Sequence, residues 1–135
     1  MAIDRELLAR AARAAAEASY SPYSRFRVGA ALLCDDGTIV TGTNVENRSY
    51  GLTICAERSA VASALSGGRR SFLAVAVSTP DSPQAVAPCG ACRQVLSEFA
   101  APEAPVFMEG SADRRQSTLG ELLPQDSLQD LKDRA

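Results

Sequence analysis

The stretches Cys55-Ala56-Glu57-Arg58 and Pro88-Cys89-Gly90-Ala91-Cys92-Arg93-Gln94 decide the fold, because the rest of the chain must bring them together. They supply three thiols and one carboxylate, with 33 residues between Cys55 and Cys89. Thiolates are soft ligands suited to zinc, and three protein ligands with one open position are typical of a catalytic zinc site. The chain has no histidine, so sulfur must supply these ligands. A carboxylate two residues after the first thiol can move protons to and from a water at the metal.

The spacing of these residues predicts how the metal is approached. Cys55 and Glu57 are two residues apart, so on a helix they lie on roughly opposite sides. Both can reach one ion only if it lies beyond the end of the helix. Cys89 and Cys92 are three apart and share a helix face. We therefore expect two helices to direct their N-termini, with their partial positive charge, at the metal.

The charge of the site needs further compensation. Three thiolates outweigh Zn²⁺ by one unit, which weakens the ion as an activator of water. Arg58, and also Arg93, could donate hydrogen bonds to the sulfurs and offset that charge. A lone C-x-x-C could also be a redox pair or a structural zinc knuckle, but the first does not need Cys55 and the second needs a fourth ligand. The spare thiol, Cys34, is expected to be a half-buried strand residue rather than a ligand.

The composition points to a small-molecule substrate. At 135 residues the chain fits one domain, and its 46% hydrophobic and 22% charged residues are ordinary for a globular protein. The net charge is −2, with one lysine and 13 scattered arginines. Nucleic-acid binding depends largely on clustered Lys and Arg, so we expect no nucleic-acid partner.

Cysteine usage and hydropathy indicate the compartment. Four cysteines, two of them in C-x-x-C, suit a reducing environment and a metal better than a disulfide scaffold. No stretch reads as a signal peptide or an 18-residue apolar span, so we expect no membrane association. The predicted location is the cytoplasm.

Periodicity predicts an alternating order of helices and strands. Helical spacing of small apolar residues, helix stop signals and an Asp-Gly hairpin signal set the boundaries. The expected helices cover residues 3–19, 54–66, 89–100 and 118–123, with a fraying helix over 127–135. The expected strands cover residues 26–34, 38–45, 71–78 and 105–109. This order implies one mixed sheet with helices on both faces.

A metal ligand, one residue and Glu, followed later by Pro-Cys-x-x-Cys, is the signature of zinc nucleobase deaminases, including a three-cysteine form. The chain resembles the small homotetrameric cytidine deaminases of pyrimidine salvage over nearly its whole length. Four blocks in the same order carry the resemblance: Tyr20-Ser21-Pro22-Tyr23-Ser24-Arg25-Phe26-Arg27-Val28-Gly29-Ala30-Ala31, Asn44-Val45-Glu46-Asn47, Thr53-Ile54-Cys55-Ala56-Glu57-Arg58 and Pro88-Cys89-Gly90-Ala91-Cys92-Arg93-Gln94-Val95-Leu96.

The resemblance implies a fold, a cofactor and a reaction. The fold is a three-layer α/β/α sandwich with a mixed central sheet, as a single cytidine deaminase-like domain over residues 1–135 that assembles into a homotetramer. Cys55, Cys89 and Cys92 hold one Zn²⁺ per subunit, and Glu57 is the catalytic residue that shuttles protons. The implied reaction is hydrolytic deamination of cytidine and deoxycytidine to uridine and deoxyuridine, with release of ammonia.

The resemblance also implies the substrate contacts. Phe26 stacks on the pyrimidine, Asn44 and Glu46 hydrogen-bond the ribose, the Ala56 backbone helps to hold the base, and Tyr50 lies at a subunit contact beside a neighbouring site. From the residues alone, Phe26 could instead be core packing, and Asn44 and Glu46 ordinary turn chemistry. Asparagine and glutamate are groups that recognise hydroxyls, which fits a ribose.

One departure from the family concerns the C-terminal region. The family commonly has an aromatic residue shortly after Leu-Leu-Pro, whereas Leu122-Leu123-Pro124 is followed here by Gln125-Asp126-Ser127-Leu128. Either Leu128 covers the site or the pocket is more open. Two other readings stay open: a deaminase of a modified cytosine nucleoside, like the blasticidin S deaminases, and a non-catalytic zinc-binding module, against which Glu57 and the three-ligand count argue.

Overall fold

The computed structural model describes residues 2–127 and residue 131 as a five-stranded mixed sheet between helices. The strands lie in the order β2-β1-β3-β4-β5, and all neighbours are antiparallel except β3 and β4. The elements in chain order are α1 (Arg5–Ala16), β1 (Gly29–Cys34), β2 (Ile39–Thr43), the 3-10 turn η1 (Tyr50–Leu52), α2 (Ala56–Ser66), β3 (Phe72–Thr79), α3 (Gly90–Ser97), β4 (Pro105–Gly110), β5 (Arg114–Thr118) and α4 (Leu119–Leu122).

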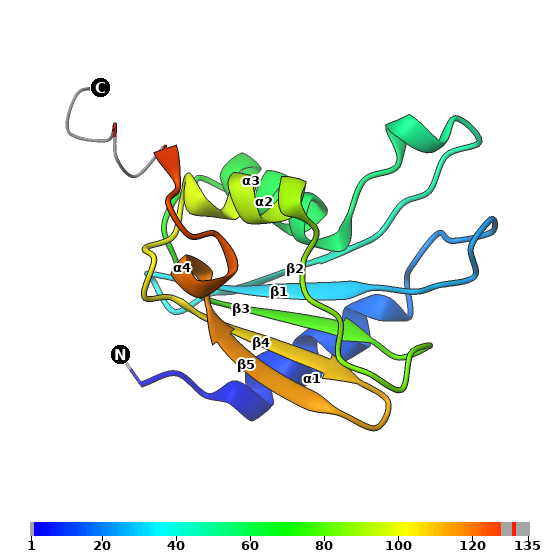
Figure 1. The fold of residues 1–135 in the computed structure, drawn as a ribbon, viewed down its shortest axis with the longest axis horizontal. Helices are drawn as coiled ribbons and strands as arrows, with labels where there is room; N and C mark the ends of the chain where they lie inside the picture. The colour runs from blue at the N-terminus through cyan, green and yellow to red at the C-terminus, as the bar shows by residue number, and fades with distance from the viewer. Residues whose placement is uncertain (1, 128–130, 132–135) are drawn as a thin grey trace.

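The sheet is covered on both faces, which confirms the three-layer α/β/α prediction (Figure 1). Helix α1 packs on one face, and α2 packs on the other beside α3. Successive strand residues point to opposite faces, so β1 contributes Ala30 and Leu32 to the core under α2 and Ala31 and Leu33 to the core under α1. This explains why all six β1 residues are buried.

Two glycines let the helices approach the sheet at backbone contact. A Cβ atom added at Gly29 would lie 1.9 Å from the carbonyl oxygen of Ala12 in α1. One added at Gly42 would lie 2.3 Å from the backbone nitrogen of Ala60 in α2. Neither distance is possible for a real side chain, so these two positions set how deeply each helix sits.

The predicted elements are present among the residues that the structure describes. The helices, β1 and β2 are shorter than predicted, whereas β3 and β4 each end one residue later than predicted. The segment 26–28 precedes β1 instead of belonging to it, and the predicted helix over 54–66 begins one residue after Cys55. The helix predicted over residues 127–135 falls mostly on residues 128–130 and 132–135, which lie outside the described residues. No helix among the described residues is long and apolar enough to cross a membrane.

Strand β5 was not predicted. Its sequence, Arg-Arg-Gln-Ser-Thr, has no apolar residue, and its first three positions are exposed. It forms because β4 offers a free edge, with Phe107 paired to Gln116 and Val106 to Ser117. A polar, charged strand is a common way to end a sheet, but it leaves no hydrophobic period to find in the sequence.

Candidate metal centre

Three cysteine sulfurs converge at the ends of two helices. Cys55 is the N-cap residue of α2 and Cys89 is the N-cap residue of α3, while Cys92 lies in the first turn of α3. The Sγ atoms of Cys55 and Cys89 are 3.8 Å apart, and those of Cys89 and Cys92 are 3.4 Å apart. All three lie within 4.8 Å of one another. Both helix N-termini therefore face the cluster, as the spacing predicted.

The cluster has the dimensions of a zinc site. Four tetrahedral ligands at about 2.3 Å from zinc place sulfurs about 3.8 Å apart, which is close to the observed separations. Within the part of the chain that the structure describes, the group contains these three ligands and no fourth His, Cys, Asp or Glu. Three sulfurs with one corner free fit a catalytic zinc ion.

The environment of the Cys55 sulfur favours its thiolate form. A hydrogen bond from the Cys92 thiol, together with Arg58, lowers the pKa of Cys55 to about 5. The Arg58 Nη2 atom donates to the Cys55 sulfur at 3.5 Å. The neighbouring Cys55 sulfur and burial raise the pKa of Cys92. The helix N-termini add positive potential at the same place.

The prediction that Arg93 donates to the sulfurs is wrong. Its Nε atom donates to the carbonyl of Pro88 at 2.7 Å, and its Nη1 atom donates to the carbonyl of Leu122 at 2.8 Å. The guanidinium thus ties the start of α3 to the end of α4. A long side chain can reach several partners, and the position of α4 decides which carbonyl is within reach.

Glu57 is a buried acid beside the sulfurs. Its residue is only 4% exposed, and it lines the same cavity as Cys55 and Cys89. Burial raises the pKa of its carboxyl group, and the nearby Cys55 acts in the same direction. A carboxyl whose pKa is shifted toward neutrality can both accept and donate a proton under physiological conditions.

The cavity beside the sulfurs has a volume of about 180 Å³. Of the residues predicted from the sequence, it brings together Phe26, Asn44, Ala56 and Glu57 with two of the cysteines. The Asn44 side chain accepts from the Val28 amide at 3.0 Å and donates to the Phe26 carbonyl at 2.9 Å, so it also holds the segment before β1 that carries Phe26. The remaining lining residues are Val28, Thr53, Val77, Thr79, Val86 and Ala87.

Two predicted substrate contacts lie outside this cavity. The Glu46 carboxylate accepts from the amides of Tyr23 and Ser24 at 3.0 and 3.1 Å and from the Ser24 hydroxyl, which lowers the Glu46 pKa. It lines a separate open hollow with Tyr23. Tyr50 is 74% exposed and lies beside Tyr23, with ring centroids 6.0 Å apart. The functional roles of Glu46 and Tyr50 stay predictions.

Sequence reasoning missed the wall formed by Val86 and Ala87. They belong to the proline-containing segment between β3 and α3, which has no regular period. Only their position just before Cys89 could have indicated a place in the site, because residues close in sequence to a metal ligand lie close to the metal.

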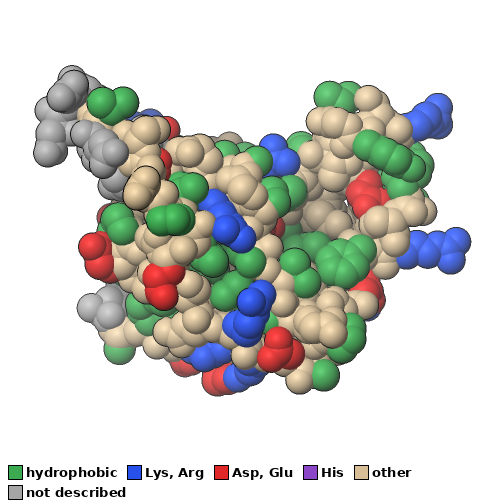
Figure 2. Space-filling model, in the orientation of Figure 1, with side chains coloured by type: hydrophobic (Ala, Val, Ile, Leu, Met, Phe, Trp, Pro, Cys, Tyr) green, Lys and Arg blue, Asp and Glu red, His purple; other side chains and the backbone are tan. Residues whose placement is uncertain are grey.

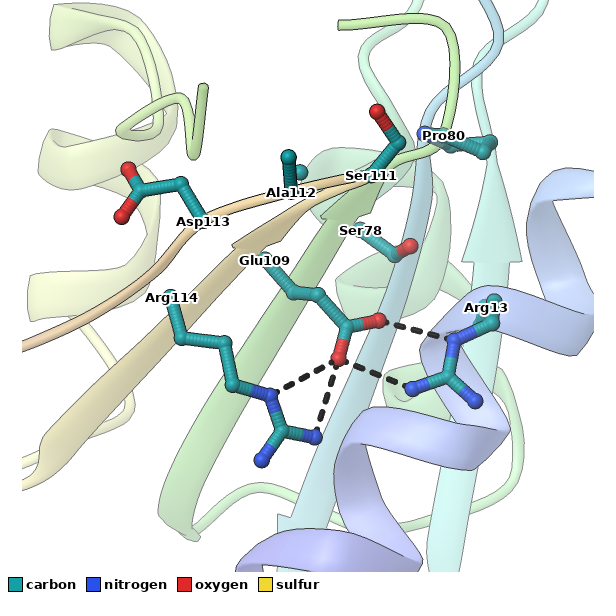
Figure 3. A pocket seen from close by; sticks show the side chains of 9 residues that line it. Arg13, Ser78, Pro80, Glu109, Ser111, Ala112, Asp113 and Arg114 are labelled. Carbon is teal, nitrogen blue, oxygen red and sulfur yellow. Dashed lines mark hydrogen bonds and ion pairs between the residues drawn. The ribbon is translucent and has the colours of Figure 1, made fainter. Parts of the chain in front are cut away.

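A larger hollow lies elsewhere and has a different character. It measures about 720 Å³ and is built around Glu109, near the carboxyl ends of β3 and β4 (Figure 3). The Glu109 carboxylate accepts from Arg13 at 2.8 Å and from Arg114 at 3.0 Å. No cysteine lines this hollow, and its charged groups largely satisfy one another. The smaller cavity is therefore the better candidate for chemistry.

Comparisons with known proteins agree with this geometry. Residues 1–108 match the family model described as "Cytidine and deoxycytidylate deaminase zinc-binding region". The chain is similar to a cytidine deaminase of Halalkalibacterium halodurans, with 49% identity over 90% of this chain and 92% of that protein. A cytidine deaminase of Sporosarcina psychrophila is 48% identical over 90% of both chains.

Solved structures give the same result. The crystal structure of cytidine deaminase from Burkholderia pseudomallei matches with a TM-score of 0.86 and 47% identity, covering 91% of this chain and 98% of that one. A blasticidin-S deaminase of Bacillus cereus is more distant, with 34% identity over 75% of this chain and 76% of that protein.

Proposed function

The chain belongs to the zinc-binding cytidine and deoxycytidylate deaminases, and from this premise we propose that it hydrolyses cytidine and deoxycytidine to uridine and deoxyuridine, releasing ammonia. Its cofactor is zinc. One observation carries the proposal: three sulfurs lie within 4.8 Å of one another with no fourth ligand among the described residues, and two of them line the same cavity as the buried Glu57. A site of this kind matches a water-activating zinc centre with its own proton carrier.

The roles of the protein groups follow from their positions. A zinc ion bound by the three cysteines supplies a Lewis acid that makes water nucleophilic near neutral pH. Glu57 accepts a proton from the attacking water and delivers it to N3 of the pyrimidine ring. Glu57 then carries the second proton to the departing amino group, which leaves as ammonia. The Arg58 guanidinium donates a hydrogen bond to the Cys55 sulfur and offsets part of its negative charge.

The substrate contacts are assigned residue by residue. Phe26 stacks on the base, and the backbone of Ala56 helps to hold it; both residues line the cavity. Asn44, at the end of the same cavity, and Glu46, in the adjoining loop hollow, hydrogen-bond the ribose hydroxyls. A site whose polar groups hydrogen-bond the ribose hydroxyls discriminates against a free base, because without the sugar the polar groups of the site would be left unpaired.

The assembly is assigned as a homotetramer in which Tyr50 contacts a neighbouring subunit beside its active site. The support is an arm, residues 45–54, that projects from the body of the molecule and carries exposed apolar side chains (Figures 1 and 2). Backbone hydrogen bonds between Val45 and Ile54 close its base, and Tyr50 and Leu52 at its tip are 74% and 66% exposed. Large exposed apolar side chains gathered in one place mark a surface that a partner covers.

The biological setting follows from the reaction. Recovery of uridine from cytidine is a step of pyrimidine salvage, which we assign to this protein. We assign it to the cytoplasm, where its four free thiols would stay reduced.

A cytidine assay with metal control tests the proposal. Loss of cytosine absorbance is followed with purified protein, after chelation, and after zinc is returned. We expect deamination that chelation abolishes and zinc restores. A protein that carries about one zinc per chain yet deaminates no nucleoside would instead be a binding module. A panel that includes blasticidin S separates the plain nucleosides from the modified one: preferred turnover of blasticidin S would overturn the substrate assignment.

A further inference from the structure

The segment of residues 80–88 forms part of the active-site wall, although it has no regular secondary structure. Val86 and Ala87 line the cavity, and the segment leads directly to Cys89. Its own backbone supplies few of its hydrogen bonds. What holds this segment in place therefore also determines the shape of the cavity and the position of one sulfur.

The β4–β5 hairpin provides that support along its length. The Ser111 amide donates to the Ser82 carbonyl at 2.7 Å, and the Ala112 amide donates to the Pro83 carbonyl at 3.1 Å. The two backbones also touch at Gly110, where an added Cβ atom would lie 2.3 Å from the Gln84 carbonyl oxygen. The hairpin thus follows the segment residue by residue as far as Gln84.

Beyond Gln84, two side chains replace the backbone contacts. The Asp113 carboxylate accepts a hydrogen bond from the Ala85 amide at 3.1 Å. The Arg115 guanidinium donates to the Ala85 carbonyl at 3.1 Å. Ala85 is 5% exposed, so water could replace these partners only if the segment moved outward. Figure 3 shows Asp113 pointing away from the ion pairs of Glu109, which leaves its carboxylate to this contact.

We propose that Asp113 and Arg115 are positioning residues of the active site, because by holding both peptide groups of Ala85 they place Val86, Ala87 and Cys89. The inference rests on the proposed function, since it assigns these residues to the cytidine cavity and its metal. Neither residue lines that cavity or belongs to the sulfur cluster, so both act through the segment.

The first test replaces Asp113, whose side chain is exposed and can be changed without disturbing the core. In D113A the Ala85 amide loses its acceptor, and the segment should loosen. The loss of a hydrogen bond to a buried amide implies a KM for cytidine raised on the order of tenfold, with kcat at saturating zinc and substrate changed less than about twofold. Hydrogen exchange should accelerate in residues 85–89, and a chelator should remove zinc more easily. D113N keeps a carbonyl oxygen that can accept from Ala85, and we expect it to behave like the parent protein.

The matched control is D36A. Asp36 is also an exposed aspartate in a hairpin turn, where it accepts from the Thr38 amide at 3.0 Å and pairs with Arg69 at 3.1 Å. It lies outside the cavity lining, so KM, zinc retention and exchange in residues 85–89 should not change.

Each outcome has a distinct meaning. If D113A matches D36A in KM, zinc retention and local exchange, the positioning role is wrong. If exchange rises throughout the molecule and kcat falls with substrate affinity, Asp113 has only a structural role and the inference also fails. If the parent protein deaminates no nucleoside, the proposed function fails instead, while zinc retention and exchange still decide whether Asp113 positions the segment.

Discussion

The burial of Glu57 raises the pKa of the carboxyl group for which we propose a role in proton transfer. The residue is 4% exposed, and the resulting rise in its pKa suits a group that must both take and give a proton. E57Q preserves the shape of the side chain and removes the acid–base function that we propose for it. Turnover of cytidine should fall by about 10²- to 10⁴-fold, the usual contribution of a general acid–base group.

Metal analysis makes this prediction specific to Glu57. Zinc content should stay near one ion per chain in E57Q, because the sulfurs are untouched. E98Q is the control, since Glu98 is an exposed residue at the end of α3. Robust turnover by E57Q would remove Glu57 from the proton pathway.

The pair formed by Asp81 and Arg27 predicts an acid-dependent stability. The Arg27 guanidinium and amide hydrogen-bond the Asp81 carboxylate and lower its pKa to about 2. Because the pKa in the folded state lies below that in the unfolded chain, about 3.9, the pair stabilises the fold above about pH 4. This contribution is lost as the pH falls from about 4 toward 2.

Denaturant unfolding of zinc-free D81N and parent protein measures this contribution. Both side chains are partly exposed, so the difference at pH 7 should be no more than about 1 kcal/mol, with the parent protein more stable. The difference should shrink as the pH is lowered below about 4. A gap that is the same at every pH would mean that ionisation of Asp81 does not contribute.

Residue types and spacing predicted the ligands but not all of their surroundings. Cys55, Cys89 and Cys92 converge as expected, because two- and three-residue separations leave few ways to reach one ion. The partners of Arg93 could not be predicted, since they depend on where α4 lies. Glutamate at position 57 was recognisable from its neighbour, whereas Val86 and Ala87 carry no pattern that links them to chemistry.

At the scale of elements, the depth of α2 on the sheet determines where Cys55 and Glu57 lie. In G42A the new methyl group would meet the Ala60 nitrogen at 2.3 Å and the Ala56 oxygen at 2.6 Å, so α2 must move outward. Overpacking of this kind costs about 1–3 kcal/mol. We also expect zinc affinity to fall by at least about tenfold, because zinc tolerates ligand displacements of only about 0.2 Å.

G29A separates the effect on the site from the effect on stability. The substituted residue would press on α1, on the opposite face of the sheet, at 1.9 Å from the Ala12 oxygen. Unfolding free energy should fall in both variants, but chelator competition should show weakened zinc binding only in G42A. Equal zinc affinity in the two variants would contradict the role of α2 depth.

Sequence patterns located the helices and buried strands because each must present an apolar face. The apolar runs of β1 and β3, which are buried along almost their whole length, gave strong signals. Strand β5 is held by backbone pairing to β4 and carries polar side chains, so its existence depends on an edge that only the folded sheet provides. The contacts between that hairpin and residues 80–88 could not be predicted either, because many of them are backbone hydrogen bonds that form only in the folded sheet.

At the scale of the whole molecule, the exposed arm predicts the effect of surface substitutions on assembly. Leu52 is 66% exposed in the single chain, so L52D should leave the fold of one subunit intact. In the proposed homotetramer the charge would be buried at a contact, and we expect sedimentation to show smaller species for L52D than for the parent protein.

L7D is the control for the arm. Leu7 is 47% exposed on α1, away from the arm, and its substitution should not change the sedimentation pattern. Unaltered assembly of L52D, or equal dissociation of L52D and L7D, would contradict a contact through the arm.

The sulfurs of the candidate centre come from two helices that are separated by an entire β-strand in the chain. A bound ion therefore joins parts of the protein that the polypeptide connects only at a distance. By mass action, a ligand that binds only the folded form raises its apparent stability with the logarithm of ligand concentration. The melting temperature of this protein should thus track the free zinc concentration of its buffer, and values measured in different buffers can be compared only when that concentration is held constant.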